Sequence, residues 1–263
     1  MGCCVKWGDT KSKQFDIPLG IKQGGINSPE FFSCYFDGLI QLLRKSKKGC
    51  YLYNLFLAII LFADDICLLA ATESALQSLI DMSASFCHDL GLSFNPLKSK
   101  VLVFSKVDLL TLMPISLNGN DVEYVTSISY LGVSIVSDRG FCVSAANELR
   151  TFYRAANSIL TAIQKPSEEI VMQLLYTNCV PIITYACGIK CFSSRDMRDC
   201  NTAINNCIRK IFSFHRWEST RLLRETLGYK SIYEIFAKTS EKLLAGLAVH
   251  PNYILRLIHL NSH

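Results

Sequence analysis

Two adjacent aspartates, Asp64 and Asp65, are the residues of this chain best suited to chemistry. A nearly unbroken apolar run, 52–61, precedes them, and a second apolar run, 66–70, follows them directly. Ionised carboxylates are costly to bury unless a partner compensates their charge. Each run has the length of a strand, so the sequence predicts a hairpin of two buried strands with both acids at its tip. Carboxylates held on such a scaffold suit a hard divalent cation such as Mg2+, which supports phosphoryl transfer.

The acid pair also has a simpler interpretation. Aspartate is a favoured turn residue, so two of them can merely end a strand. Other segments of the chain decide between the two interpretations. One is the loop Gln23-Gly24-Gly25. Its glycines let the backbone approach a ligand closely, and its glutamine offers both a donor and an acceptor, although a plain turn with an exposed glutamine has the same composition.

Two further segments carry polar or conformationally special residues. The stretch 91–98 ends a helical pattern with Gly91 and places Lys98 in a short loop. The stretch Tyr130-Leu131-Gly132-Val133 is a strand interrupted by glycine, which favours close approach to another backbone. Taken alone, Lys98 is better explained as a solvated loop cation, and Tyr130 as an ordinary sheet residue.

The elements that must position these residues follow from apolar periodicity and capping signals. Ser28-Pro29 predicts a helix start, with Ser28 as the cap, and Thr72 with Ser74 predicts another that Gly91 ends. The predicted strands lie around the acid pair and at 13–17, 92–95, 101–104 and 128–136. The predicted later helices span 141–164, 167–190 and 194–213, with Pro181 expected to kink or break the second. The fold class is therefore α+β, with helices packed on a mainly antiparallel sheet and a helical region after it.

The four polar segments, in this order and spacing, resemble the reverse transcriptase domain of non-LTR (LINE-type) retrotransposons. The matching motifs are Gln-Gly-Gly-x-x-Ser-Pro, Phe-Ala-Asp-Asp, Gly-Leu-x-x-Asn-x-x-Lys and Tyr-Leu-Gly-Val. The resemblance implies a polymerase palm over 1–136 and a helical, thumb-like and carboxyl-terminal region over 137–263. It also implies RNA-directed DNA synthesis with Mg2+, or Mn2+ in its place, on an RNA template, a DNA primer and deoxynucleotides.

The same resemblance implies roles for individual residues. Asp64 and Asp65 match the metal-binding catalytic acids, and Lys98 matches a lysine proposed to protonate pyrophosphate. The loop Gln23, Gly24 and Gly25 matches a motif near the incoming nucleotide and the template. The segment Tyr130, Leu131 and Gly132 matches the hairpin that supports the primer end.

One expected feature of that family has no counterpart in this sequence. Relatives carry another catalytic aspartate several tens of residues before the Gln-Gly-Gly loop, after a fingers region. Asp9 and Asp16 lie too close to Gln23 to take this place. We therefore expect an amino-terminally truncated polymerase. Its chemistry would require, as a partner, the missing amino-terminal part of the same polypeptide. Little activity is expected from this chain alone.

Positive charge is concentrated toward the carboxyl end. The net charge is +5 overall, and residues 190–224 alone carry eight basic against three acidic residues. This excess suggests phosphate contacts by Arg209 and Lys210, and a second cluster suggests them for Lys47 and Lys48. A solvated helix face and a favourable helix carboxyl terminus are the respective alternatives. A non-catalytic nucleic-acid-binding remnant, or a decayed copy of an element, is thus a second hypothesis for the function.

Cysteine usage and hydropathy bear on compartment. Twelve cysteines lie scattered, mostly within apolar segments, as expected of reduced thiols in an intracellular protein. The sequence favours neither the nucleus nor the cytoplasm. No apolar stretch reaches the length of a membrane span, so no membrane partner is expected. The spacing of Cys187, Cys191, Cys200 and Cys207 with His215 favours core packing over zinc binding.

Overall fold

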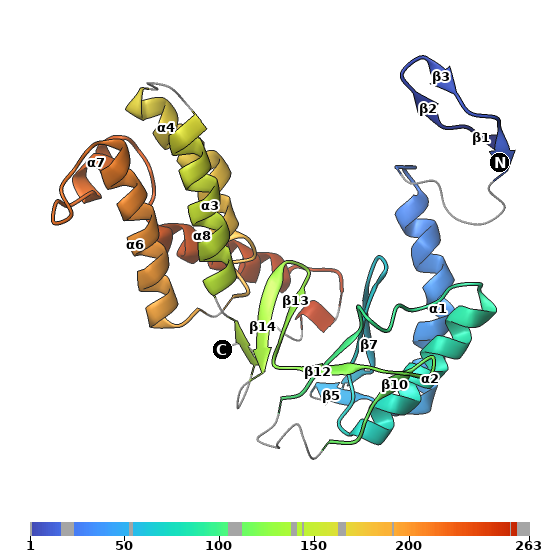
Figure 1. Ribbon diagram of the computed structural model, residues 1–263. Coiled ribbons are helices and arrows are strands. Elements are labelled where there is room, and N and C mark those ends of the chain that lie inside the picture. Colours follow the sequence, from blue (N-terminus) through green and yellow to red (C-terminus); the bar gives the residue numbers. More distant parts are fainter. Residues whose placement is uncertain are drawn as a thin grey trace. The chain divides into compact units, whose positions relative to one another are not determined.

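The chain divides into two compact units in a computed structural model (Figure 1). The structure describes residues 2–16, 24–52, 55–104, 112–137, 145–162, 167–190, 192–252 and 254–256, together with the backbone of 141–143. The first unit comprises Met1–Ser99 and Leu110–Glu123, and the second comprises Lys100–Leu109 and Tyr124–His263. The strands after Glu123 therefore group with the helical region in the second unit.

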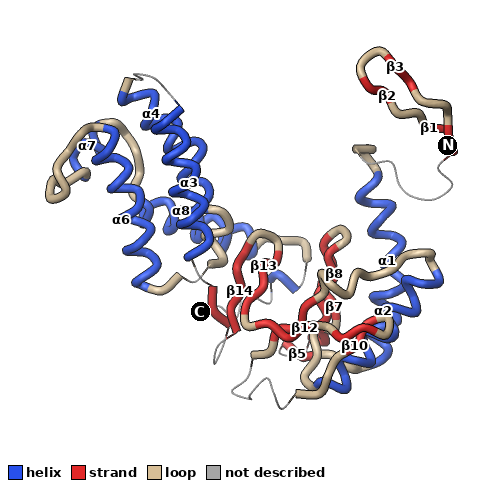
Figure 2. The backbone as a smooth tube through the Cα atoms, viewed as in Figure 1, coloured by secondary structure: helices blue, strands red, loops and turns tan. Residues whose placement is uncertain are grey.

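The described strands are short, and most of them form small antiparallel ribbons (Figure 2). In the first unit they are β1 (Gly2–Cys3), β2 (Lys6–Trp7), β3 (Thr10–Lys11), β4 (Phe15–Asp16), β5 (Cys50–Leu52), β6 (Leu55–Leu57), β7 (Ile59–Phe62), β8 (Asp65–Leu68), β10 (Ser116–Leu117) and β11 (Asn120–Asp121). The others are β9 (Lys100–Leu102), β12 (Glu123–Val125), β13 (Ser127–Tyr130), β14 (Val133–Ser137) and β15 (Phe141–Val143). The α+β class is confirmed, but the described strands form separate pairs and one three-stranded sheet, β13-β14-β15, instead of one broad sheet.

The core of the first unit lies between two helices and the β7–β8 hairpin. The helices are α1 (Ser28–Ser46) and α2 (Glu73–Asp89). Its fully buried members include Leu39, Leu43 and Leu79, and apolar residues of β7 and β8 pack against them. This cluster fixes the hairpin to both helices, because burying each such side chain contributes about 2 kcal/mol to the stability of the fold.

The β7 strand is buried on one face only, which corrects the prediction of a wholly buried hairpin. Ile59 and Leu61 pack against the core, whereas Ile60 is 44% and Phe62 61% exposed. Side chains alternate between the two faces of a strand, and the helices cover one of those faces. An apolar run alone does not reveal this difference.

Of the two predicted helix starts, that of α2 is confirmed and that of α1 is displaced by one residue. Thr72 caps α2, because its hydroxyl accepts a hydrogen bond from the Ala75 N–H at 3.3 Å. The cap of α1 is Asn27, one residue before the predicted Ser28, and its side chain makes no capping hydrogen bond. Gly91 follows α2 with a φ of +71°, as its predicted role as a helix stop requires.

The second unit is built from helices around one apolar core. They are α3 (Ala146–Ala162), α4 (Glu168–Leu174), α5 (Val180–Thr184), α6 (Ser194–Ile211), α7 (Arg221–Thr226) and α8 (Ile232–Ala248). Phe152, Met172, Ile183 and Ile208 are fully buried in that core. The first predicted helix of this region was too long, because Phe141–Val143 pairs with β14 as a strand. None of the described helices is long and apolar enough to cross a bilayer.

The helix around Pro181 is broken as predicted. A π-helical turn, Leu175–Cys179, separates α4 from α5, and Pro181 lies in the first turn of α5. Proline lacks the N–H that a helix interior needs, and a wider turn before it accommodates the interruption. Tyr185 follows α5 directly and has left the helical conformation.

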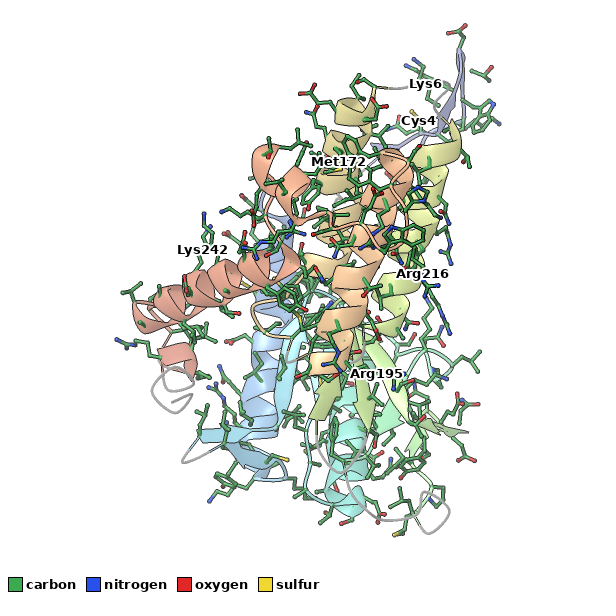
Figure 3. The ribbon with its side chains drawn as sticks, turned by 90° about the vertical axis from the view of Figure 1, so that its left-hand side faces the viewer. Cys4, Lys6, Met172, Arg195, Arg216 and Lys242 are labelled. Atoms are coloured by element: carbon green, nitrogen blue, oxygen red, sulfur yellow. The ribbon has the colours of Figure 1, made fainter. Side chains whose placement is uncertain are left out.

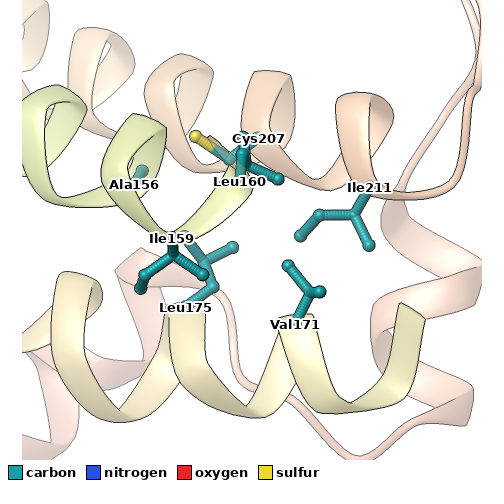
Figure 4. Close-up of a pocket in the computed structure, with 7 residues that line it drawn as sticks. All are labelled: Ala156, Ile159, Leu160, Val171, Leu175, Cys207 and Ile211. Atoms are coloured by element: carbon teal, nitrogen blue, oxygen red, sulfur yellow. The ribbon is translucent and has the colours of Figure 1, made fainter. Parts of the chain in front are cut away.

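A small internal hollow lies among α3, α4 and α6 (Figure 4). Its volume is about 10 Å³, and its lining is entirely apolar, including Ile159, Val171 and Cys207. A void of this size is too small for a ligand, and its apolar lining offers an ordered water no hydrogen-bond partner. It is a packing gap of the core.

Candidate functional site

The acid pair lies at the tip of the β7–β8 hairpin. Phe62 pairs with Asp65, so Ala63 and Asp64 form the two-residue turn between the strands. Ala63 has a φ of +49°, a left-handed conformation that costs a non-glycine residue about 1 kcal/mol. Strained residues of this kind occur often at functional sites, where the packed surroundings hold them in place.

Both carboxylates are exposed and available to a ligand. Neither the Asp64 nor the Asp65 carboxylate forms a hydrogen bond or an ion pair with another described residue. Their oxygens therefore keep the lone pairs that a hard cation needs, and the hairpin beneath them is anchored in the core. The donor chemistry fits Mg2+ or Mn2+.

The number of ligands is small. Within the described part of the chain, no group of three or more His, Cys, Asp or Glu residues is arranged to hold a metal ion. Mg2+ commonly keeps several waters and takes one or two carboxylates together with substrate phosphates. Asp64 and Asp65 fit that incomplete type of site, in which the remaining ligands come from elsewhere.

The glycine loop is partly described. Gln23 lies outside the described residues. Gly24 has a φ of +81°, and no other atom would crowd a side chain placed there. The Gly25 carbonyl accepts a hydrogen bond from the Ser28 N–H at 3.2 Å, immediately before α1. The loop thus presents open backbone at a helix amino terminus.

Lys98 is exposed in a turn after α2. Its backbone N–H donates to the Asn95 carbonyl at 3.2 Å, so the loop is ordered while the ammonium group faces solvent. It belongs to the same compact unit as Asp64 and Asp65. No ion pair joins Lys98 to either carboxylate among the described residues.

The Tyr130-Leu131-Gly132 segment forms a tight turn between β13 and β14, in the second unit. Tyr130 pairs with Val133, and the two turn residues have φ values of +48° at Leu131 and +74° at Gly132. Positive φ at both positions is what a type I′ hairpin turn requires. Glycine meets this requirement easily and leucine does not, so Leu131 needs support from outside the turn.

Tyr185 supplies that support. Its hydroxyl donates a hydrogen bond to the Leu131 carbonyl at 3.0 Å. Its ring lies so close to Gly132 that a β-carbon there would be 3.1 Å from a ring carbon. The glycine is therefore required for its φ and for this close approach. Nothing in the sequence around Tyr185 indicated this contact, which spans 54 residues.

An open cavity of about 330 Å³ lies beside this turn, within the second unit. Most of its lining surface is apolar, although most of the residues that line it have polar side chains. The lining residues are Ser129, Gly132, Ser134, Asn147, Glu148, Thr151, Ile182 and Tyr185. The Asn147 amide donates to the Ser134 hydroxyl at 3.1 Å and so ties α3 to β14.

A buried ion pair lies next to this cavity. The Lys190 ammonium donates to a Glu148 carboxylate oxygen at 2.7 Å, and the side chains are 0% and 8% exposed. The same ammonium lies 5.6 Å from the ring centre of Tyr185 and 5.7 Å from that of Phe192. Such aromatic contacts favour a desolvated cation. The pair thus connects α3 to the residue that holds the turn.

The basic residues proposed for phosphate contact have structural partners in part. The Lys48 ammonium donates to the Ser78 hydroxyl at 2.9 Å, and Lys47 caps α1 with a φ of +55°. Arg209 donates to the Glu218 carbonyl at 3.0 Å, whereas Lys210 is exposed. Lys47 and Lys48 lie at the carboxyl end of α1 and Lys210 at that of α6, and all three are exposed, so their phosphate contacts stay predictions.

The cysteines near the carboxyl end are core residues where described. Cys187, Cys200 and Cys207 are buried in the second unit, while Cys191 lies outside the described residues. Burial raises the pKa of Cys200 to about 12 and that of Cys207 to about 11. Neutral thiols of this kind are poor metal ligands and poor nucleophiles.

Comparison with known proteins shows the family of this chain. Residues 4–135 match the family model described as reverse transcriptase (RNA-dependent DNA polymerase), about half of the chain. A retrovirus-related Pol polyprotein from a type-2 retrotransposable element of Drosophila melanogaster is 36% identical over 84 residues. That alignment covers 32% of this chain and 8% of the relative, so the chain spans a small part of the relative's length.

Proposed function

The chain belongs to the reverse transcriptase (RNA-dependent DNA polymerase) family, and on this basis we propose that it takes part in RNA-templated DNA synthesis of a retrotransposon. The observation that carries the proposal is the acid pair. Asp64 and Asp65 stand exposed and unpaired among described residues, on a hairpin fixed to the core. The resemblance of the four motifs to non-LTR elements supports the same assignment.

Asp64 and Asp65 would hold the divalent cation of this reaction. A bound Mg2+ or Mn2+ would activate the primer 3′-hydroxyl and stabilise the leaving pyrophosphate. The remaining proposed roles belong to the chain's own groups. The Gln23–Gly25 loop lets backbone approach the nucleotide and template, and Lys98 donates a proton to pyrophosphate. The Tyr130–Gly132 turn supports the primer end, with Tyr185 as a positioning residue.

We expect the 263-residue chain by itself to show little primer extension. Two carboxylates leave the metal site short of ligands, because two-ion phosphoryl transfer clamps both the attacking and the leaving oxygen. Primer extension on an RNA template with deoxynucleotides and Mg2+ measures this directly. Efficient extension that Asp64→Asn abolishes would contradict the expectation of low activity while supporting the assignment of the acid pair.

Metal binding tests the acid pair without requiring turnover. Titration with Mn2+, followed by electron paramagnetic resonance, should show at least tenfold weaker binding for Asp64→Asn, about 1.4 kcal/mol. Asp121→Asn is the matched control, since Asp121 is another exposed aspartate of a short hairpin in the same unit. Equal Mn2+ affinity of the wild type and Asp64→Asn would refute the proposed metal site.

Nucleic-acid binding without catalysis is the second candidate function. The net charge of +5 over residues 190–224 favours it, because phosphate contacts depend on such an excess. This function predicts oligonucleotide binding that weakens with salt and persists in Asp64→Asn. Binding that is absent or independent of salt would refute it.

A further inference from the structure

An aromatic loop, residues 213–219, follows α6 and exposes a stacked pair of rings. The His215 and Trp217 rings have centroids 4.8 Å apart and planes only 4° from parallel. Trp217 is 80% exposed, so the face that His215 does not cover is open to solvent. No described residue of the apolar core packs against Trp217. Core packing therefore does not explain this side chain.

The loop is held in one conformation by hydrogen bonds at both ends. The Phe214 N–H donates to the Arg209 carbonyl at 2.9 Å, and the Arg209 guanidinium donates to the Glu218 carbonyl at 3.0 Å. Across the turn, the Glu218 N–H donates to the His215 carbonyl at 3.1 Å, and the Glu218 carboxylate accepts from the His215 N–H. An exposed aromatic pair on a fixed turn loses little conformational entropy when it binds a flat ligand.

Positive charge surrounds the ring pair. Residues 205–221 contain four basic residues and one acidic residue, a net charge of +3. Arg216 lies between the two rings in sequence and is exposed (Figure 3). Lys210 is exposed at the end of α6. The one acid, Glu218, is occupied within the loop. A ligand with a flat ring and negative charge fits this surface.

We infer that His215 and Trp217 form a stacking platform for an unpaired base of single-stranded nucleic acid, with Arg216 and Lys210 contacting the adjoining phosphates. Unpaired bases expose the ring faces that stack on aromatic side chains, and the basic surroundings follow the backbone. Paired bases in a duplex keep those faces covered. The inference rests on the proposed nucleic-acid function and adds to it a location, a contact type and a preference for single strands.

Oligonucleotide binding by the full chain tests the platform. Fluorescence anisotropy would follow a labelled 12-nucleotide oligothymidylate, a 12-unit abasic strand of the same charge, and a 12-base-pair duplex. Trp217→Leu should weaken oligothymidylate binding about 5- to 150-fold, and Trp217→Phe should retain most of the affinity, because phenylalanine keeps a stacking face. Tyr233→Leu, which removes another exposed aromatic of the same unit, should have no effect.

The abasic strand separates stacking from other contributions. Wild type and Trp217→Leu should bind it equally, since it offers no base to stack. Arg216→Gln should weaken both strands and lower the salt slope of binding by about 0.7. Unchanged helical circular dichroism in Trp217→Leu verifies that the fold is intact.

Four results would overturn the inference: a Trp217→Leu affinity within twofold of wild type, an equal loss on the abasic strand, tighter binding of the duplex, or no oligonucleotide binding at all. The Mn2+ titration at Asp64 does not depend on Trp217. Failure of the platform with normal Mn2+ binding therefore leaves the proposed metal site standing.

Discussion

Breaking the buried ion pair of the second unit should strongly destabilise it. In Lys190→Met, the Glu148 carboxylate loses its partner at 2.7 Å while remaining 8% exposed. At an effective dielectric of about 20, the attraction across this distance is about 6 kcal/mol, and desolvation of the two ions offsets much of it in the wild type. The variant keeps the desolvation cost of the carboxylate without the attraction. We expect a loss of about 3–5 kcal/mol.

Equilibrium urea unfolding, followed by circular dichroism at 222 nm, measures this loss. With a slope of about 2 kcal/mol per molar urea, a loss of about 4 kcal/mol lowers the midpoint by about 2 M. Arg195→Met is the matched control, because Arg195 belongs to an exposed pair with Asp199 at 4.0 Å. Its midpoint should be unchanged, since exposed pairs contribute little.

A double variant separates the lost charge partner from lost packing. Glu148→Leu with Lys190→Met replaces both ions by apolar groups and should recover most of the stability. Two results would refute the reasoning. One is a Lys190→Met variant within about 1 kcal/mol of wild type, and the other is a double variant as unstable as the single one.

Three further predictions concern the turn, the thiols and the metal. Gly132→Ala should lower the free energy of unfolding by about 1–2 kcal/mol, because φ is +74° and Tyr185 leaves little room; in a Tyr185→Ala background the urea-measured penalty should shrink, and an equal penalty would disprove the contact. The raised thiol pKa values of Cys200 and Cys207, about 12 and about 11, stabilise the fold below the ordinary thiol pKa of 9.0, so stability should fall as pH rises from 9 through 11–12. At pH 8 iodoacetamide should modify these two thiols far more slowly than exposed ones, and equal rates would contradict their burial. Removing Mn2+ with EDTA should lower the thermal midpoint only by the small mass-action stabilisation that any ligand of the native state gives, because the hairpin of Asp64 is anchored by apolar contacts. Loss of the cooperative unfolding transition in EDTA would make the ion structural.

Much of the fold was predictable from local sequence. The Thr72 cap, the Gly91 stop, the hairpin at the acid pair and the break at Pro181 all occur where local rules placed them. These features depend on a few adjacent residues, through capping hydrogen bonds, permitted φ values and a missing N–H. Because these effects involve only residues close together in the chain, they can be predicted from a single sequence.

The sequence was less informative wherever distant segments decide the outcome. The apolar run of β7 did not reveal that one face of this strand is exposed. The sequence also did not reveal that Phe141–Val143 pairs as a strand.

The sequence by itself determined the identity of the acid pair and of the family motifs, because both consist of residue types in a fixed order. Only the tertiary structure decided that Tyr185 holds the turn at Leu131, that Lys190 neutralises Glu148, and that the ring pair at His215 stands exposed. The physical reason is the sequence separation of the interacting groups. Hydrogen bonds and ion pairs of this kind join groups that are 42 and 54 residues apart, and burial depends on every segment that covers a side chain.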